Sequence, residues 1–247
     1  MQTALKNQDK HCPHNKQTSC GNCRLNTICM PVSLHIDDIN RLDQIIQRGK
    51  PLHKGEYLFR ANDPFTAVYA VRSGAVKTIT ISDNGDEQVT GFYLPGEVLG
   101  MDGLATNFHS NSVIALETSS ICEIPFHRLE DLSVQLPSLQ RHFLQLMSRE
   151  ITQEQQMITL LNKNNAESRI ASLLLSISAR NSSRKLSASN FILPMSRTDL
   201  GNFLGLTIET VSRTFARLQK NNLLEINKKE IIISDITALQ KLAKGAD

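Results

Sequence analysis

The feature that most constrains the fold is a long helical segment at residues 138–165, between Pro137 and an Asn-Lys-Asn-Asn cluster. Apolar residues recur along it at alternating spacings of three and four, the repeat along which two helices pair in a coiled coil. The seam residues are Leu144, Met147, Ile151, Glu154, Ile158 and Leu161. One helix therefore offers another a narrow apolar stripe with a carboxylate set into it.

A second apolar stripe on the same segment suits packing within the chain. It comprises Leu139, Phe143 and Leu146, and it gives way to polar residues beyond Glu150 while the seam continues. The far half of the segment therefore needs a partner of its own. A strict repeat of about 3.5 residues favours parallel pairing of two copies over burial inside one chain.

Glu154 lies inside this seam. In a helix pair the two Glu154 carboxylates approach each other in a partly dry environment, where like charges repel and desolvation is unfavourable. We hypothesise that Glu154 keeps the homodimer marginal, so that a modest signal elsewhere in the molecule tips the equilibrium.

The composition is that of a soluble globular protein and allows two domains, with 247 residues, 40% hydrophobic and 21% charged. The N-terminus is polar and the apolar runs are short, so we expect no membrane span or export signal and a cytoplasmic location. Thiols stay reduced in the cytoplasm, and the five cysteines therefore favour metal or redox chemistry over disulfides.

Positive charge gathers in the last third of the chain. From residue 166 onward there are twelve Lys and Arg against seven Asp and Glu, whereas the whole chain has a net charge of only +3. A positive field attracts a phosphate backbone, although many solvated helices are also basic.

Three cysteines cluster near the N-terminus, at Cys20, Cys23 and Cys29. The C-x2-C spacing lets two thiolates reach one metal centre from a single turn, and the gap to Cys29 suits a larger object than one zinc ion. Spacing alone leaves open a zinc knuckle completed by His11 or His14 and an iron–sulfur cluster completed by Cys122. A disulfide is disfavoured by a reducing cytoplasm, and Cys12 is interpreted as a bystander.

Residues 34–125 consist of short alternating runs interrupted by glycine and proline turns. They predict strands at residues 57–61, 67–71, 76–81, 88–94 and 112–118, with Cys122 on the last strand before Pro125. Asn84-Gly85 between two such runs predicts a β-hairpin. Regular turns without intervening helices predict an antiparallel barrel or jelly roll.

The C-terminal part predicts a winged helix-turn-helix, preceded by an amphipathic helix at residues 166–179 and a serine-rich loop at 181–190. Ser196 and Asp199 form a capping signature for a helix that ends near residue 204. Gly205 then turns the chain, and Thr207 caps a second helix that ends near residue 221. Residues 223–226 and 230–233 form the predicted wing hairpin.

Three residues near the start of that second helix are candidates for contact with DNA bases, namely Glu209, Ser212 and Arg213. They lie opposite an apolar stripe, and this end of the helix enters the major groove in helix-turn-helix proteins. Arg213 can bind guanine O6 and N7, Glu209 can accept from cytosine N4, and Ser212 can reach a base edge or a thymine methyl. The alternative is that Glu209 and Arg213 form only a surface ion pair four residues apart.

The order of these parts resembles the bacterial cyclic-AMP receptor superfamily, and the segment Glu209-Thr-Val-Ser-Arg213 is similar to its recognition motif. The cysteines at positions 20, 23, 29 and 122 narrow the resemblance to the fumarate and nitrate reduction regulators, over essentially the whole chain. The resemblance implies an α+β fold with a cysteine-rich arm at residues 1–31 and an antiparallel β-roll (jelly-roll) sensor domain at 32–136. The implied fold continues with a coiled-coil dimerisation helix at residues 137–165 and ends with a winged helix-turn-helix DNA-binding domain at 166–247.

The resemblance implies a transcription regulator rather than an enzyme, which activates and sometimes represses genes of anaerobic metabolism. It implies that Cys20, Cys23, Cys29 and Cys122 bind a 4Fe-4S cluster that holds the homodimer together. Oxygen converts the cluster to a 2Fe-2S form, and DNA binding is lost. It also implies that Glu209, Ser212 and Arg213 read TTGAT half-sites of an inverted-repeat operator in double-stranded DNA.

Contacts with RNA polymerase are implied at two surfaces, comprising Ser73, Gly85, Asp86, Arg184 and Ser187. Arg24 directly follows Cys23 and places a cation beside a cluster of net negative charge.

The sequence departs from the cyclic-nucleotide binders of the superfamily, which hold the phosphate with an arginine. The corresponding segment here is Gly100-Met101-Asp102-Gly103-Leu104, and no arginine occurs between Arg72 and Arg128. A phosphate would lack its bidentate partner, so we expect no cyclic nucleotide to bind. Two rival interpretations are a cyclic-nucleotide-type regulator and an iron–sulfur redox enzyme or electron carrier, for which no second cofactor motif occurs.

Overall fold

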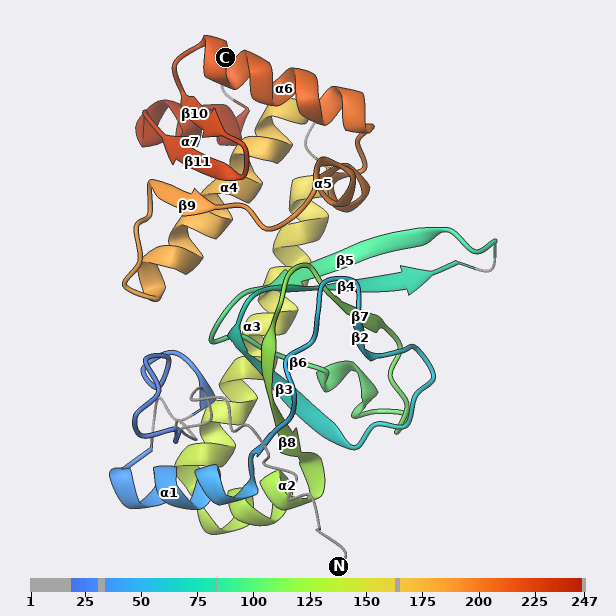
Figure 1. Cartoon of the computed structure of the whole chain (residues 1–247), viewed down its shortest axis with the longest axis vertical. Coiled ribbons are helices and arrows are strands. Elements are labelled where there is room, and N and C mark those ends of the chain that lie inside the picture. Colours follow the sequence, from blue (N-terminus) through green and yellow to red (C-terminus); the bar gives the residue numbers. More distant parts are fainter. Residues whose placement is uncertain (1–18, 31–33, 83, 163–164, 246–247) are drawn as a thin grey trace, which may run out of the picture.

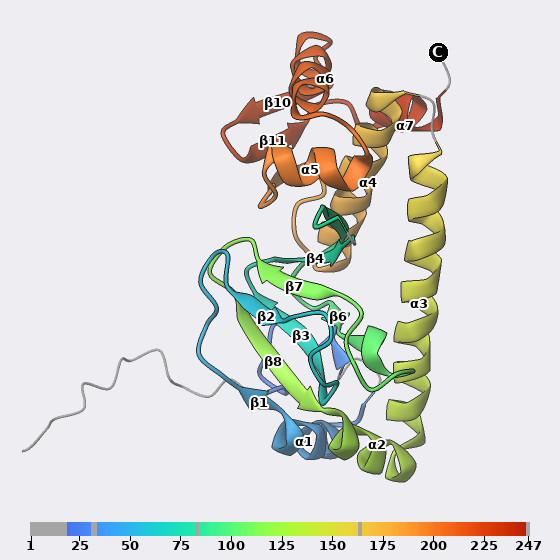
Figure 2. The same ribbon diagram turned by 90° about the vertical axis from the view of Figure 1, so that its right-hand side faces the viewer.

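The computed structural model describes residues 19–30, 34–82, 84–162 and 165–245. The longest helix, α3 (Pro137–Leu161), runs along one side of the molecule, past a β-roll and up to a C-terminal helical part (Figures 1 and 2). None of the described helices combines the length and apolar character needed to cross a membrane. The predicted His11, Cys12 and His14 lie outside the described residues.

The β-roll consists of two four-stranded antiparallel sheets, which confirms the predicted roll. One sheet has the order β1-β8-β3-β6, with β1 (Gln47–Arg48), β8 (Ser120–Pro125), β3 (Ala67–Ser73) and β6 (Val98–Leu99). The other has the order β2-β7-β4-β5, with β2 (Tyr57–Phe59), β7 (Ser112–Ala115), β4 (Val76–Ile81) and β5 (Glu87–Tyr93). The turn after β4 contains Asn84-Gly85, as the hairpin signal predicted.

The expectation that no helix interrupts residues 34–125 is wrong. Helix α1 (Ile36–Ile45) precedes the first strand, and a short 3-10 helix, η2 (Met101–Gly103), follows β6. A further helix, α2 (Phe126–Gln135), connects the roll to α3. Leu42 of α1 and Leu129 of α2 are fully buried in one core, so burial against the first sheet stabilises these short helices.

Helix α3 uses different faces at its two ends. Near its start, Leu139 is buried and Phe143 and Leu146 pack in the core below the first sheet, which confirms the predicted inward stripe. Near its end, Met157 and Leu160 pack against the C-terminal core. The helix therefore contacts both halves of the molecule through apolar side chains.

The C-terminal part has the predicted winged helix-turn-helix, with additional elements. Its helices are α4 (Ala166–Ser183), α5 (Arg197–Leu204), α6 (Ile208–Lys220) and α7 (Ile236–Lys244). The wing strands β10 (Leu224–Asn227) and β11 (Glu230–Ile233) are joined by an unpredicted third strand, β9 (Asn190–Ile192). Both predicted caps are present, since Ser196 and Asp199 form a capping box and Thr207 accepts from the Thr210 amide.

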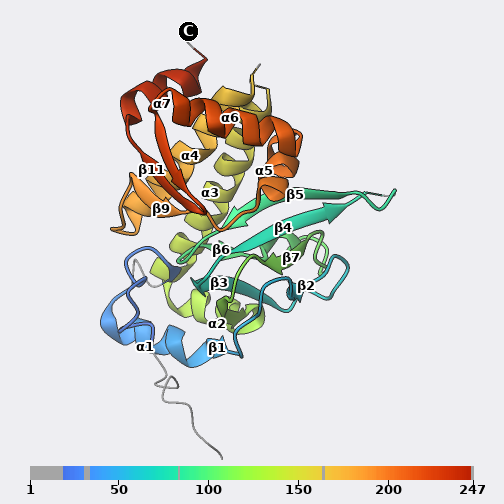
Figure 3. The same cartoon turned by 45° about the horizontal axis from the view of Figure 1, so that its top comes forward.

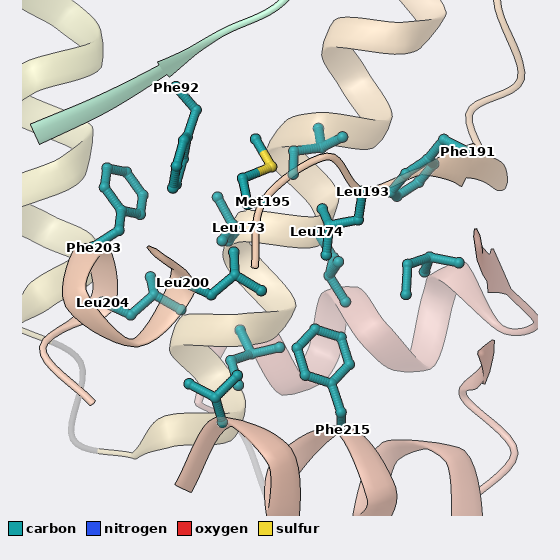
Figure 4. Packing of buried hydrophobic residues seen from close by; sticks show 14 of the residues in the cluster. Phe92, Leu173, Leu174, Phe191, Leu193, Met195, Leu200, Phe203, Leu204 and Phe215 are labelled. Carbon is teal, nitrogen blue, oxygen red and sulfur yellow. The ribbon is translucent and has the colours of Figure 1, made fainter. Parts of the chain in front are cut away.

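The core of this part holds the two helices of the motif at a fixed angle. Leu200 and Leu204 of α5 pack with Phe215 of α6 and with Leu174 of α4 (Figure 4). Gly205 has a φ of 63° between the helices, a left-handed conformation that glycine adopts without strain. Helix α6 consequently lies at the end of the molecule opposite α1 (Figure 1).

The β4–β5 hairpin contacts the first helix of the motif (Figure 3). The Lys77 ammonium lies 2.7 Å from the Asp199 carboxylate, and Asn202 donates to the Glu87 carbonyl at 2.6 Å. Phe92 packs on Phe203 with ring centroids 4.8 Å apart. The DNA-binding motif is therefore tied directly to the roll as well as through α3.

Gly74 and Gly55 provide a matched test of backbone constraint in the roll. Both have a φ near 80°, but a Cβ on Gly74 would lie 2.5 Å from the Thr118 carbonyl oxygen, whereas one on Gly55 meets nothing within 4 Å. Gly55→Ala should lower the free energy of unfolding only by the conformational strain of about 1–2 kcal/mol. Gly74→Ala should lower it by more, because the neighbouring backbone must also move. Thermal unfolding checks this, and equal effects of the two changes would contradict it.

Candidate functional site

The four predicted cysteine ligands line one small cavity between the N-terminal arm (residues 19–30) and the first sheet of the roll. The cavity has a volume of about 30 Å³, and Cys20, Cys23, Cys29 and Cys122 all contribute to its wall. Each is a free cysteine. Cys122 comes from β8, so the structure brings together residues about a hundred positions apart in the sequence.

Successive turns of the arm place its three thiols around this cavity. The Cys23 amide donates to the Cys20 carbonyl at 3.3 Å, and the Cys29 amide donates to the Leu25 carbonyl at 2.9 Å. Leu25 is buried, and the arm approaches the loop before β6 so closely that a Cβ on Gly96 would lie 2.6 Å from Ile28 Cδ1. The arm therefore has a defined position on the roll even though it contains little regular structure.

The chemistry of the cavity fits a sulfur-ligated metal cluster. Burial raises the pKa of Cys29 to about 12 and raises the pKa of Cys20 and Cys122 as well. Thiolates in such a site require the compensating positive charge of a metal. Within the described ranges, no three Cys, His, Asp or Glu side chains are close enough to hold a single metal ion. Four thiols around a shared cavity suit a multi-iron cluster better than one zinc ion.

Two charged residues at this site, Asp43 and Arg48, were not anticipated from the sequence. The Asp43 carboxylate accepts the Cys20 amide at 2.8 Å and forms an ion pair with Arg48. Arg48 also lies opposite Cys122 in the β1–β8 ladder and lines the cavity. Arg24, the cation that the sequence placed beside a cluster, is exposed.

The predicted seam of α3 is largely uncovered. Leu144, Ile151 and Ile158 are 58–61% exposed, Leu161 is 37% exposed, and Glu154 is also exposed, while Met147 is half-buried. These side chains form a continuous surface stripe, because they recur at the spacing of the seam on one helix. A stripe of this kind on a single helix matches the surface of a coiled-coil partner.

The candidate base-contacting residues share the exposed face of α6. Glu209, Ser212 and Arg213 are exposed, whereas Val211 and Phe215 are buried on the opposite face. Within the part of the chain that the structure describes, no ion pair joins Glu209 to Arg213, and both side chains are open to solvent. Helix α6, which carries this face, lies at one end of the molecule (Figures 1 and 2).

A larger cavity of about 400 Å³ lies between the second sheet and the middle of α3. Among the described residues lining it are Asp102, Glu150 and Glu154, and none is a Lys, Arg or His. Tyr93 donates to Glu150, whose pKa is raised by burial. Burial tends to raise the pKa of Asp102, but hydrogen bonding to His109 outweighs it and holds this pKa below its usual value. The cavity is therefore unsuited to a phosphate.

The predicted polymerase contacts differ in accessibility. Gly85, Asp86 and Ser187 are exposed, and Ser73 is half-buried. The Arg184 side chain is only 3% exposed, and its guanidinium lies 2.6 Å from the Glu97 carboxylate. This burial counts against a direct contact of Arg184 with another protein.

Comparisons with known proteins agree with this architecture. The family described as Crp-like helix-turn-helix domain matches residues 168–242, and the one described as Cyclic nucleotide-binding domain matches residues 50–135. Among solved structures, FixK2 from Bradyrhizobium japonicum is 27% identical, with a TM-score of 0.73, covering 80% of this chain and 97% of that one.

Curated relatives are more similar in sequence and are transcription regulators rather than enzymes. The chain is 52% identical over 231 residues to the transcriptional activator protein FnrA of Stutzerimonas stutzeri, covering 94% of this chain and 95% of that protein. It is 45% identical over 224 residues to the fumarate and nitrate reduction regulatory protein of Escherichia coli (strain K12), covering 91% and 90%. The chain therefore belongs to the fumarate and nitrate reduction regulator family of Crp-like transcription regulators.

Proposed function

We propose that this protein is an oxygen-responsive, cytoplasmic transcription activator whose iron–sulfur cluster controls a DNA-binding homodimer. The observation that carries the proposal is the cavity shared by the four cysteines, whose thiols are the donor set of an all-thiolate cluster. When bound, a 4Fe-4S cluster supplies an oxygen-labile metal centre. Cys20, Cys23, Cys29 and Cys122 are its proposed ligands.

The packing around this cavity suggests how ligation reaches the dimer helix. Cys29 and Cys122 pack in the same core as Phe143 and Leu146 of α3. Ligation that fixes the arm therefore also fixes the first half of α3, which continues into the exposed seam. This linkage couples the order of the arm to the geometry of the dimer surface.

The energy required is within reach of such a site. Moving an equilibrium from mostly monomer to mostly dimer requires about 5 kcal/mol of differential stabilisation. Metal–thiolate bonds that form only in the folded arm supply free energy of this order or more. The repulsion between two Glu154 carboxylates is the unfavourable contribution to dimer formation that this free energy must offset.

We propose that the dimer binds an operator with two-fold symmetry through α6. Glu209, Ser212 and Arg213 lie on its exposed face, where they can reach base edges. The family resemblance implies that the half-sites they read are of the TTGAT type. Two-fold symmetry of the protein requires an inverted repeat in the DNA. Gly85, Asp86 and Ser187, which are exposed, and Ser73 are the proposed contacts with RNA polymerase.

We further propose that no cyclic nucleotide regulates this chain. The cavity between the roll and α3 has carboxylates where a phosphate needs cations. The similarity to cyclic-nucleotide-binding domains then reflects a shared scaffold with a different signal.

The ligand assignment is tested by removing single cysteines. Cys122→Ala should abolish the visible absorbance of anaerobically purified protein and its iron and sulfide content, because the cluster loses its only ligand from the roll. Cys12→Ala is the matched control and should keep both. Loss of the absorbance in Cys12→Ala but not in Cys122→Ala would overturn the assignment. In a separate measurement, air exposure of the wild type should bleach the absorbance and reduce the dimer fraction.

The role of Glu154 is tested without metal. Glu154→Ala should raise the dimer fraction of the metal-free protein, by about 1–4 kcal/mol of association free energy, because a like-charge pair is removed from the seam. Sedimentation velocity measures this fraction. Gln155→Ala, a neighbouring exposed residue off the seam, serves as the control and should change nothing. An unchanged monomer fraction in Glu154→Ala would count against the hypothesis.

Base reading by Arg213 is separable from attraction to the DNA backbone. Arg213→Ala should lose about 1–3 kcal/mol of discrimination at one guanine of the half-site, more than it loses in general affinity. Lys220→Ala, at the other end of α6, should weaken binding about equally for all sequences. Binding of matched and mutated operators to the anaerobic protein distinguishes the two effects, and a uniform loss with Arg213→Ala would refute base reading.

A further inference from the structure

We propose that Arg48 is a positioning residue for the cluster, donating N–H···S hydrogen bonds from its guanidinium to the sulfur atoms in the cysteine-lined cavity. This inference rests on the proposed function, because it requires a cluster in that cavity. The sequence suggested Arg24 as the cation beside the cluster, whereas this inference assigns that position to Arg48 of strand β1.

The guanidinium already contacts one proposed ligand. Arg48 Nη2 lies 3.7 Å from Cys20 Sγ, which is within hydrogen-bond distance for a sulfur acceptor. The same strand position faces Cys122 across the β1–β8 ladder. Arg48 therefore lies between ligands that come from the arm and from the roll.

Asp43 holds this arrangement in place. One oxygen of its carboxylate accepts the Cys20 amide at 2.8 Å and also binds Arg48 Nη2. The carboxylate thus fixes the main chain of a ligand and the guanidinium that approaches its sulfur. A side chain ordered in this way loses little further entropy when it donates to a cluster.

A buried donor of Arg48 has no acceptor in the described part of the chain. The Nε atom is inaccessible and makes no hydrogen bond. A buried donor without a partner destabilises the fold, and a charged group does so more strongly than a neutral one. Sulfur atoms of a cluster in the adjacent cavity would satisfy this donor.

Charge complementarity supports the same interpretation. A cluster held by four thiolates carries net negative charge, and Arg48 is one of two arginines that line the cavity, with Arg72. Because Asp43 neutralises part of the Arg48 charge, the contribution of Arg48 is mainly directed hydrogen bonds. Hydrogen bonds to the sulfurs are among the features that set cluster reduction potentials.

The alternative is that the Asp43–Arg48 ion pair only ties α1 to β1. Such a role affects the stability of the metal-free fold and leaves the properties of a bound cluster unchanged. The test therefore needs measurements on the cluster itself. Arg48→Gln removes the charge and the fork, and Arg48→Lys keeps the charge without the Nε donor. Lys50→Gln, which removes an exposed positive charge two residues after Arg48, is the matched control.

Full-length variants and wild type are reconstituted anaerobically with iron and sulfide, and three properties are measured. Arg48→Gln should lose iron to a chelator about tenfold faster or more. Its Fe–S stretching bands should shift in resonance Raman spectra. Its midpoint potential at an electrode should become more negative, because the electron added by the electrode is no longer stabilised by the N–H···S bonds. Arg48→Lys should recover part of each effect, and Lys50→Gln should match wild type.

The outcomes separate this inference from the proposed function. A wild-type chain that takes up no iron and sulfide would overturn both. Loaded Arg48→Gln with wild-type spectra, potential and chelator resistance would overturn only the role of Arg48. If Arg48→Gln does not take up iron and sulfide, Asp43→Asn gives the second test. This variant keeps the Arg48 guanidinium but removes the carboxylate charge that orients it. Cluster spectra of Asp43→Asn identical to those of wild type would refute the proposal. Circular dichroism of the metal-free variants reports any loss of folding.

Discussion

The structure depends on a helix whose apolar surface exceeds what one chain covers. Helix α3 buries Leu139 against the roll at its start and packs Met157 against the C-terminal part near its end. A third face, with Ile151 and Ile158, remains exposed. Removing apolar surface from water contributes about 25 cal/mol per Å², so burying this face against a second apolar surface would be favourable. The proposed role of Glu154 is to oppose that association. The helix is therefore both a structural support and the element on which a signal can act.

Ion pairs connect the roll to the DNA-binding part independently of this helix. Glu97, the last residue before β6, binds both Arg180 and Arg184 of the α4 region, and Lys77 binds Asp199 at the first helix of the motif. Arg184 is nearly inaccessible, so this pair is charge-assisted and shielded from solvent. The roll is therefore joined to the DNA-binding part by two sets of contacts, one along α3 and one through Glu97 and the β4–β5 hairpin. In the proposed dimer, both sets of contacts would bear on the separation of the two α6 helices.

What the sequence predicted correctly is largely what local chemistry determines. The capping box of Ser196 and Asp199 and the cap at Thr207 locate the helix-turn-helix, because each acts within one helical turn. The two-residue strands β1 and β6 and the short helix α1 were missed, since pairing and burial with distant segments stabilise them. Arg48 was missed for the same reason, because its partner Cys122 is brought to it only by the sheet. The cysteine spacing predicted a metal site, whereas the cavity that unites the four thiols required the fold.

The two cavities of the roll explain how one scaffold can serve different signals. The acidic cavity adjoins the middle of α3 at Glu150 and Glu154, whereas the cysteine-lined cavity belongs to the core that contacts its first turns at Leu139 and Phe143. A ligand in the first position would act on the seam directly. The proposed cluster in the second would act at the base of the helix, and its effect would have to pass along several helical turns to reach Glu154. Such an arrangement works only if α3 is rigid and its dimer is marginal, which gives a physical reason for a carboxylate in an otherwise apolar stripe.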